Sequence, residues 1–361
     1  MALRAGPSYD PQRTLRIRPT SRRNRDRQGK PTMTTSPPDL VDPLAVVHPS
    51  LRSGLGWLVR RMSRRKVTIE SVLSRRWLDR FIERVAGRGV PVRMIPRKGG
   101  SPDVRVWVID HRTHATKTPT PAVLHIHGGG YIGSSMAHMF SVMKQLSAEL
   151  DCLVVSVDYR LAPETKFPGS LEDNYAALAW LHANAAALNI DVRRIAVMGE
   201  SAGGGHAAAL AIAARDRGDY ALAAQVLVYP MLDDRTGSSA AHMPASSGVG
   251  AFIWTAVLNV LGWTSLLGMP AGSASPPHGA VPSRVDDLRG LPPAWIGVGT
   301  LDLFHDEDVA YAARLKAAGV ATTLDVVEGA YHGFDILVKK APVSKAFAES
   351  WKSALRSAFR A

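Results

Sequence analysis

Ser201 lies in a short glycine-rich segment that could present its hydroxyl group as a nucleophile. Residues 199–203 read GESAG, which has the form G-x-S-x-G. The segment follows the apolar run RIAVM, typical of a strand, and precedes an alanine-rich stretch typical of a helix. This strand-turn-helix setting is that of a nucleophile elbow, in which flanking glycines let the backbone turn sharply beside the serine. The alternative is a glycine-rich turn in which the serine only caps a helix. That alternative gives no role to Asp302, His332 or the glycines at 128–130.

Two polar residues farther along the chain could activate Ser201. A serine hydroxyl is a weak nucleophile at neutral pH and needs a general base that is itself held by a carboxylate. Behind a nucleophile elbow, the order along the chain is serine, acid, histidine. Asp302 follows the apolar run AWIGVG and His332 follows LDVVEG, so we predict Asp302 as the orienting acid and His332 as the base. Asp306 and Glu307, one helical turn after Asp302, remain alternatives for the acid.

A run of three glycines could supply donors for a developing oxyanion. Residues 127–131 read HGGGY and close the third apolar run. Glycine N–H groups have no side chain in the way, so two of them, together with the N–H of Ala202, could surround the charged oxygen of a tetrahedral intermediate. A phosphate-binding loop is the competing interpretation of a glycine-rich sequence, but the pattern G-x-x-x-x-G-K is not present here. His127 precedes the glycines, and we expect it to brace the loop through hydrogen bonds.

Eight apolar runs and the helical patterns between them predict the elements that position these residues. The runs are rich in β-branched and aliphatic residues and lie at 92–95, 104–109, 122–127, 152–157, 195–198, 225–229, 295–298 and 324–327. From the third run onward, helical periodicity occupies 136–150, 168–187, 202–215, 306–318 and 343–358. Strands that alternate with helices predict an α/β fold with a mainly parallel, doubly wound sheet, in which ligands bind at the strand ends.

Two regions depart from this alternation, and we interpret them as a cap over the strand ends. Residues 38–90 show two amphipathic helical patterns, one from Val47 to Met62 and one from Val72 to Val85. Residues 231–290 are a long insertion rich in Gly, Ser and Pro.

The insertion contains 22 uncharged residues, 248–269, which are long enough to suggest a membrane span. A span at this place would put Ser201 and Asp302 on opposite sides of a bilayer. We therefore predict cap helices with at most peripheral lipid contact.

Charge and composition narrow the function classes. The chain has 361 residues, 46% hydrophobic and 21% charged, which is the balance of a globular protein. Residues 1–32 carry a charge of +7 out of the net +13, and we predict a disordered basic extension that binds no nucleic acid, because no aromatic platform or recognition helix accompanies it. One cysteine, Cys152, allows no internal disulfide, and no Cys/His spacing suits zinc.

No targeting segment is recognisable near the start of the chain. The SRR triplet at 21–23 is followed only by polar residues, so we expect a cytoplasmic protein. Met33 opens a more conventional N-terminus, MTTSPPDL, and residues 1–32 could be an upstream extension.

Several motifs together resemble those of a known family. HGGGY, DYRLAPETKFPGSLED at 158–173, GESAGG at 199–204, GTLDLFHDE at 299–307 and YHGF at 331–334 are similar to those of the hormone-sensitive-lipase-like carboxylesterases of the α/β-hydrolase superfamily. The likeness runs from about residue 90 to the C-terminus with the motifs in the expected order. Glu200 stands where Asp is commoner in the family.

The resemblance implies an α/β-hydrolase fold with an eight-stranded, mostly parallel sheet, flanking helices and a helical cap. It also implies site residues, which are the triad Ser201, Asp302 and His332 and the oxyanion donors Gly129, Gly130 and Ala202. Residues 158–164 would form a turn that supports the oxyanion loop. No metal or organic cofactor is implied.

We accordingly expect a serine carboxylesterase that acts on small short- to medium-chain esters through an acyl-enzyme. An amide or peptide hydrolase and a non-catalytic small-ligand receptor remain alternatives, and the chain could pair as a homodimer. Trp254 and Trp263 either line an acyl pocket or fill the core of the cap. The predicted organisation is an extension at 1–37, cap helices at 38–90, the two parts of the core at 91–230 and 291–361, and the cap insertion at 231–290.

Overall fold

The computed structural model describes most of the chain after residue 43. The described ranges are 44–53, 68–97, 101–113, 118–133, 136, 139–239 and 248–360, together with two short strands, β1 (Asn24–Arg25) and β2 (Pro31–Thr32). The chain divides into two units, residues 1–45 and 46–361. In the first unit, β1 and β2 pair antiparallel. The predicted disorder of residues 1–37 otherwise lies outside the described residues.

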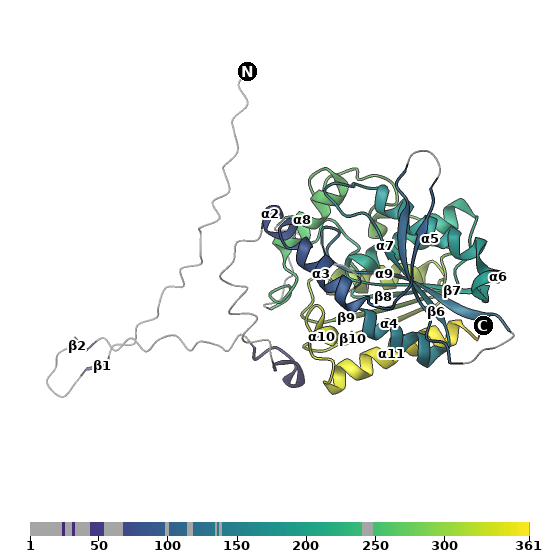
Figure 1. Cartoon of the computed structure of the whole chain (residues 1–361). Helices are drawn as coiled ribbons and strands as arrows, with labels where there is room; N and C mark the ends of the chain where they lie inside the picture. Colours follow the sequence, from purple (N-terminus) through teal and green to yellow (C-terminus); the bar gives the residue numbers. More distant parts are fainter. Residues whose placement is uncertain are drawn as a thin grey trace, which may run out of the picture. The chain divides into compact units, whose positions relative to one another are not determined.

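The second unit is built on an eight-stranded sheet, as predicted (Figure 1). Its strands are β3 (Val92–Ile95), β4 (Val104–Ile109), β5 (Thr120–Ile126), β6 (Leu153–Asp158), β7 (Ile190–Glu200), β8 (Ala224–Val228), β9 (Ala294–Gly299) and β10 (Thr322–Val327). They lie in the order β10-β9-β8-β7-β5-β6-β4-β3. β3 and β4 pair antiparallel, as do β4 and β6, and the other neighbours are parallel. The prediction of a mostly parallel sheet is confirmed.

Helices cover both faces of this sheet. α5 (Gly169–Ala183), α7 (Ala202–Arg217) and α9 (His305–Ala317) pack on one face, and α4 (Phe140–Leu150) and α11 (Pro342–Ala358) pack on the other (Figure 1). Every residue of β5, β8 and β9 is buried, because the helices exclude water from both sides. Fully burying one Val, Leu or Ile side chain contributes about 1.5–3 kcal/mol to the free energy of unfolding. These central strands are therefore a stable support for the loops at their ends.

The segment before the first strand of this sheet differs from its prediction. The expected helix from Val72 to Val85 is two helices, α2 (Ile69–Leu73) and α3 (Arg76–Ala86), separated by a turn. At the start of α2, the Thr68 side chain accepts a hydrogen bond from the Ser71 N–H and the Ser71 hydroxyl accepts one from the Thr68 N–H. This capping box fixes the start of α2 just after the described range resumes.

The other predicted helix, from Val47 to Met62, is wrong at its start. Residues 44–47 form a turn, and Pro49–Leu51 form a short 3-10 helix. This helix begins at Pro49 because proline is well suited to the first helical position and because the Nδ1 atom of His48 accepts a hydrogen bond from the Ser50 N–H. Residues 54–67 lie outside the described residues.

The insertion at 231–290 contains one α-helix in its described part, α8 (Ala256–Leu267), and a 3-10 turn, Pro282–Arg284. The uncharged run 248–269 is therefore only partly helical. None of the helices in the described ranges is long and apolar enough to cross a membrane.

Candidate active site

The nucleophile predicted from the sequence, Ser201, lies in a sharp turn between β7 and α7. Its backbone has φ 57° and ψ −123°, a strained conformation for a non-glycine residue. Gly203 permits the turn, since a Cβ there would lie 2.0 Å from the carbonyl oxygen of Ile126 at the end of β5. The start of α7 thus passes directly over the end of β5, where the glycine-rich loop begins. This close approach brings the serine and the loop together.

The structure brings Ser201, His332 and Asp302 into one hydrogen-bonded chain. The Nε2 atom of His332 is 3.0 Å from the Ser201 Oγ, and its Nδ1 is 2.8 Å from the Asp302 Oδ2. The tautomer with a proton on Nδ1 satisfies both contacts, because the imidazole then donates to the carboxylate and accepts from the serine hydroxyl. All three residues are buried, with exposed fractions of 8%, 6% and 1%. This arrangement can remove the serine proton and stabilise the imidazolium that results.

The second carboxylate oxygen of Asp302 is also hydrogen-bonded, which fixes the orientation of the side chain. Asp302 follows β9, and its Oδ1 accepts a hydrogen bond of 3.0 Å from the Phe304 N–H. His332 follows β10 and precedes the short helix α10 (Phe334–Leu337). Because β9 and β10 are parallel neighbours, their carboxyl ends place the two loops side by side.

The two alternatives for the acid point elsewhere. Asp306 has a side chain that is 79% exposed and pairs with His305 at 2.8 Å. Glu307 is buried and accepts hydrogen bonds from the N–H groups of Leu232 and Asp233. Burial raises the pKa of Glu307 well above its usual value. Neither carboxylate contacts His332 in the described structure, whereas Asp302 does.

The imidazole of His332 is enclosed by aromatic rings. The ring centres of Tyr229, Phe304 and Trp254 lie 4.8, 5.2 and 6.2 Å from it. The first two contacts are edge-on, a preferred geometry for aromatic pairs. These walls restrict rotation of the imidazole away from the serine. Trp254 is the tryptophan that reaches the site, whereas Trp263, on α8 of the insertion, is fully buried against Tyr131.

Residues 127–133, called here the oxyanion loop after the role predicted for their glycines, turn beside Ser201. Gly129 and Gly130 have φ of 125° and 61°, a region that favours glycine. Their N–H groups donate to no backbone carbonyl among the described residues, whereas the Gly129 carbonyl accepts from Ile132 and Gly133. The N–H of Ala202, at the first position of α7, has no partner within its helix. These three N–H groups are those predicted as oxyanion donors.

Buried tyrosines hold the oxyanion loop in place. The Tyr159 hydroxyl donates to the His127 carbonyl at 2.9 Å, and the two rings stack with centres 4.5 Å apart. His127 also bonds the Gly128 carbonyl through Nδ1 at 2.8 Å, so it braces the loop as expected. The Tyr131 hydroxyl donates to the Met231 carbonyl at 2.9 Å. The loop is therefore tied to β6 and to the start of the insertion.

The turn at 158–164 packs against this loop. The Ala162 N–H donates to the Tyr131 carbonyl at 2.9 Å. Arg160 forms an ion pair with the buried Asp173 at 2.8 Å, which fixes the turn on α5. Arg76 of α3 donates to the Ile132 carbonyl at 2.9 Å and pairs with Glu164 at 2.8 Å. One arginine thus joins α3, the turn and the oxyanion loop.

Gly130→Ala should lower kcat/KM for a small ester by about 10²–10³-fold, because it displaces an oxyanion donor. A Cβ at Gly130 would lie 2.0 Å from the Trp254 ring, and φ is left-handed there. Gly133→Ala is the matched control, since its Cβ would meet the Val72 side chain at 3.5 Å and the Gly129 carbonyl oxygen at 3.9 Å, both ordinary contacts. Steady-state kinetics of the two variants check the prediction. Equal losses in both would contradict it.

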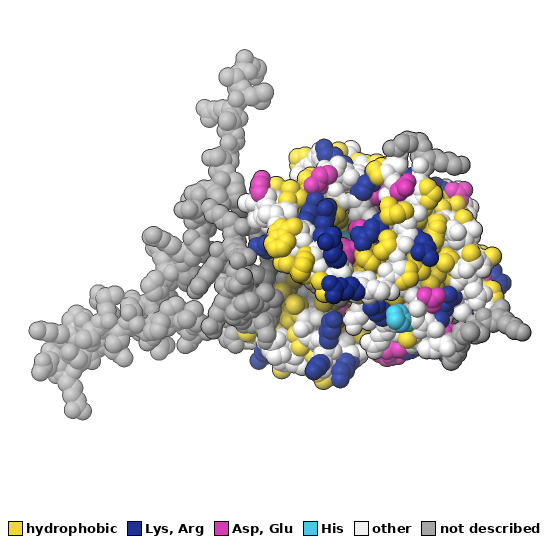
Figure 2. Space-filling model, in the orientation of Figure 1, with side chains coloured by type: hydrophobic (Ala, Val, Ile, Leu, Met, Phe, Trp, Pro, Cys, Tyr) yellow, Lys and Arg dark blue, Asp and Glu magenta, His cyan; other side chains and the backbone are white. Residues whose placement is uncertain are grey.

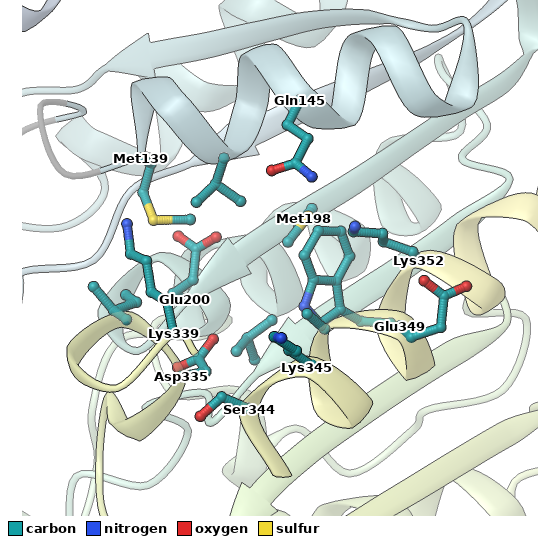
Figure 3. Close-up of a pocket in the computed structure, with 15 residues that line it drawn as sticks. Met139, Gln145, Met198, Glu200, Asp335, Lys339, Ser344, Lys345, Glu349 and Lys352 are labelled. Atoms are coloured by element: carbon teal, nitrogen blue, oxygen red, sulfur yellow. The ribbon is translucent and has the colours of Figure 1, made fainter. Parts of the chain in front are cut away.

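A cavity of about 390 Å³ lies behind the turn at Ser201, between α4, α10 and α11 (Figure 3). Glu200 and Asp335 line it, whereas Ser201, Asp302 and His332 do not. Glu200 bonds the His125 Nε2 at 3.0 Å. Its carboxylate therefore serves a buried structural contact on this side of the sheet.

Tyr229 and Asp335 connect this cavity to His332, the predicted base. The Tyr229 hydroxyl donates to the Asp335 Oδ1 at 2.9 Å, while its ring contacts His332. Burial, reinforced by the nearby charge of Glu200, raises the pKa of Asp335 to about 6. Sequence reasoning missed both residues. The YHGF motif ends one residue before Asp335, but no local pattern signals a partner 106 positions away in the chain.

Asp335→Asn should raise the free energy of unfolding at pH 8 by about 1–3 kcal/mol. Ionising Asp335 costs more in the folded state, where its pKa is about 6, than in the unfolded chain, where it is about 3.9. The wild-type protein therefore loses stability as pH rises from about 4 through 6. Asparagine carries no charge and still accepts the hydrogen bond from Tyr229.

Urea denaturation at pH 8 and at pH 4 tests this expectation. The stabilisation of Asp335→Asn should shrink toward pH 4, where the wild-type carboxyl is protonated in the folded protein. A variant that is less stable than wild type at pH 8, or equally shifted at both pH values, would contradict the argument.

The described residues include no group of three His, Cys, Asp or Glu side chains that could hold a metal ion. Cys152 is buried beside β6, and burial raises the pKa of its thiol to about 12. It is thus protonated at neutral pH and poorly nucleophilic.

Comparisons with known proteins agree with the fold. A family model described as alpha/beta hydrolase fold matches residues 123–336. Esterase LipI of Mycobacterium tuberculosis is 33% identical over 285 residues, which are 74% of this chain and 85% of that protein. Carboxylesterase NlhH of the same species is 36% identical over 222 residues, 59% of this chain and 66% of that protein. The solved structure of a bacterial heroin esterase matches with a TM-score of 0.75 at 33% identity and covers 89% of this chain and 100% of its own.

Proposed function

This chain belongs to the hormone-sensitive-lipase-like carboxylesterases of the α/β-hydrolase superfamily, and from that premise we propose that it hydrolyses carboxylic esters with Ser201 as nucleophile. The single observation that carries the proposal is the hydrogen-bonded chain from the Ser201 Oγ through His332 to Asp302. The esterase names of the relatives support the reaction class.

The proposed reaction has two halves. The Ser201 Oγ attacks the ester carbonyl carbon while its proton passes to the His332 Nε2, and a tetrahedral oxyanion forms. The N–H groups of Gly129, Gly130 and Ala202 stabilise that oxygen. The C–O bond to the alcohol then breaks, and His332 returns the proton to the leaving oxygen. This half ends with an acyl-enzyme.

Water then repeats the sequence on the acyl-enzyme. His332 takes a proton from the water, the hydroxide adds to the acyl carbon, and the Ser201 oxygen leaves with the proton from His332. The carboxylic acid is released and the free serine is restored. Asp302 remains ionised throughout and holds the imidazole in its productive tautomer.

We propose short- to medium-chain acyl groups as substrates. The segments 38–90 and 231–290 would form the cap, and Trp254 supports an apolar acyl pocket because its ring lies beside both His332 and Gly130. Each buried methylene contributes about 0.8 kcal/mol until the pocket is filled, so kcat/KM should rise with chain length and then fall.

A series of p-nitrophenyl esters from C2 to C16 tests the chain-length limit. We expect the highest kcat/KM between about C4 and C8, since a longer chain would extend beyond the cap. Faster turnover of emulsified long-chain triglyceride than of dissolved butyrate ester would overturn this limit, while leaving the esterase assignment intact.

Paired substrates that share one acyl group distinguish an esterase from an amidase. The p-nitrophenyl ester and the p-nitroanilide of butyric acid use the same nucleophile but differ in the leaving group. Esterase function predicts that the ester has much the higher kcat/KM. Comparable values for the two would favour an amide hydrolase, and binding of the ester without turnover would favour a receptor.

A further inference from the structure

The side of α3 that faces away from the body of the protein is apolar. Trp77, Leu78, Phe81 and Val85, called here the outer face of α3, have exposed fractions of 69%, 42%, 59% and 47%. At 3.6 residues per turn they fall within an arc of about 100° on one side of the helix. Single exposed apolar residues are ordinary on a protein surface, but four on adjacent turns, two of them aromatic, form a patch that marks an interaction site.

The polar side of the same helix faces inward. Glu83 is buried at 4% exposure and pairs with Arg105 of β4 at 3.0 Å. Arg76 donates to the Ile132 carbonyl and pairs with Glu164, so α3 is held to the body largely by hydrogen bonds and ion pairs. A surface helix ordinarily buries its apolar stripe and exposes its polar side. α3 does the reverse, so its outer face does not serve packing within the described body.

Exposed arginines border the outer face of α3. Arg80 and Arg84 lie about 60° and 20° around the helix from Trp77, on the side away from Leu78. Neither lies within salt-bridge distance of a carboxylate in the described ranges. Where Figure 1 places α3, Figure 2 shows hydrophobic side chains beside a row of Lys and Arg side chains. The surface is thus apolar and cationic together.

We infer that the outer face of α3 docks onto the surface of an anionic phospholipid bilayer. Tryptophan and phenylalanine insert at the boundary between headgroups and acyl chains, and arginines bind lipid phosphates, which is the composition of an interfacial amphipathic helix. A second copy of this chain fits less well, because pairing two outer faces would bring Arg80 and Arg84 toward their own counterparts. Docking would bring α3, whose inward-facing Arg76 contacts the oxyanion loop, close to the membrane surface, where poorly water-soluble esters accumulate.

Flotation of the full chain with large unilamellar vesicles tests the inference. We expect binding to vesicles of 70% phosphatidylcholine and 30% phosphatidylglycerol, and about tenfold weaker binding to pure phosphatidylcholine or at high salt. The double variant Trp77→Ser/Phe81→Ser should bind the anionic vesicles about tenfold more weakly than wild type. Met94→Ser is the matched control, since Met94 is an apolar residue 54% exposed on β3.

The basic N-terminal segment could also attract anionic lipid, but it is the same in all of these variants. Wild-type affinity in Trp77→Ser/Phe81→Ser, with unchanged thermal stability, would therefore assign binding to another part of the chain and overturn the inference. Failure of the wild-type protein to bind anionic vesicles would do the same. A dimer in sedimentation that dissociates in the double variant would show instead that a second copy covers this face. None of these results depends on esterase activity.

Discussion

Ser201→Ala should abolish ester hydrolysis, with kcat for p-nitrophenyl butyrate reduced by about 10⁶-fold. The expected loss is this large because Ser201 forms the covalent bond, and no other described hydroxyl occupies the hydrogen bond to the His332 Nε2. The oxyanion donors remain, so a small residual rate above that of water is expected. Substrate binding should change little, since the substitution only removes one oxygen atom.

Labelling with a fluorophosphonate probe gives a readout that does not require turnover. Wild-type protein should be labelled once, at Ser201, and Ser201→Ala should not be labelled. Ser353→Ala is a control, because Ser353 is an exposed serine on α11 and should keep both labelling and kcat. Circular dichroism and thermal unfolding should be the same in all three proteins. Retained labelling in Ser201→Ala would place the nucleophile elsewhere and end the proposal.

The sheet could be predicted because its signal is local. Strands such as β5 and β8 are buried on both faces. Because helices cover both sides of the sheet, such strands appear in the sequence as nearly continuous apolar runs. The strand ends shifted by a few residues, most of all at β7, which begins at Ile190 rather than 195. The charged residues Asp191, Arg193 and Arg194 obscured that start, since this end of the strand is less buried.

Only those residues of the candidate site that lie in a recognisable sequence motif could be predicted. Ser201, Asp302 and His332 each follow a recognisable strand, and parallel strands bring their ends together. Asp306 and Glu307 could not be separated from Asp302 by sequence, because the direction of each side chain depends on where α9 begins, which is at His305. Tyr229 and Asp335 carry no motif that links them to each other.

α3 shows the limit of periodicity as evidence. The pattern correctly indicated a helix, but periodicity does not tell which side of the helix packs inward. Here the polar contacts of Glu83 with Arg105 and of Arg76 with Glu164 lie on the inner side of α3, the reverse of the usual orientation. Such contacts join residues far apart in the chain, so a single sequence does not reveal them.

Asp302→Asn should lower kcat by about 10⁴-fold while leaving the fold intact. The Phe304 N–H donates to the Asp302 Oδ1, and an asparagine would keep its carbonyl oxygen there. Its amide NH₂ would then face the His332 Nδ1, which would have to accept a hydrogen bond. The imidazole proton would move to Nε2, so the histidine would no longer accept the proton of Ser201.

Asp306→Asn is the matched variant, since it makes the same chemical change four residues away. The Asp306 side chain is 79% exposed and contacts only His305 among the described partners, so kcat should stay within about twofold of wild type. Steady-state kinetics on p-nitrophenyl butyrate at pH 8 compare the two. A large loss in Asp306→Asn with near-normal activity in Asp302→Asn would assign the role of the acid to Asp306, in the first turn of α9. Large losses in both would mean that the combined negative charge of Asp302 and Asp306, rather than the single hydrogen bond from Asp302 to His332, keeps the imidazole able to act as a base.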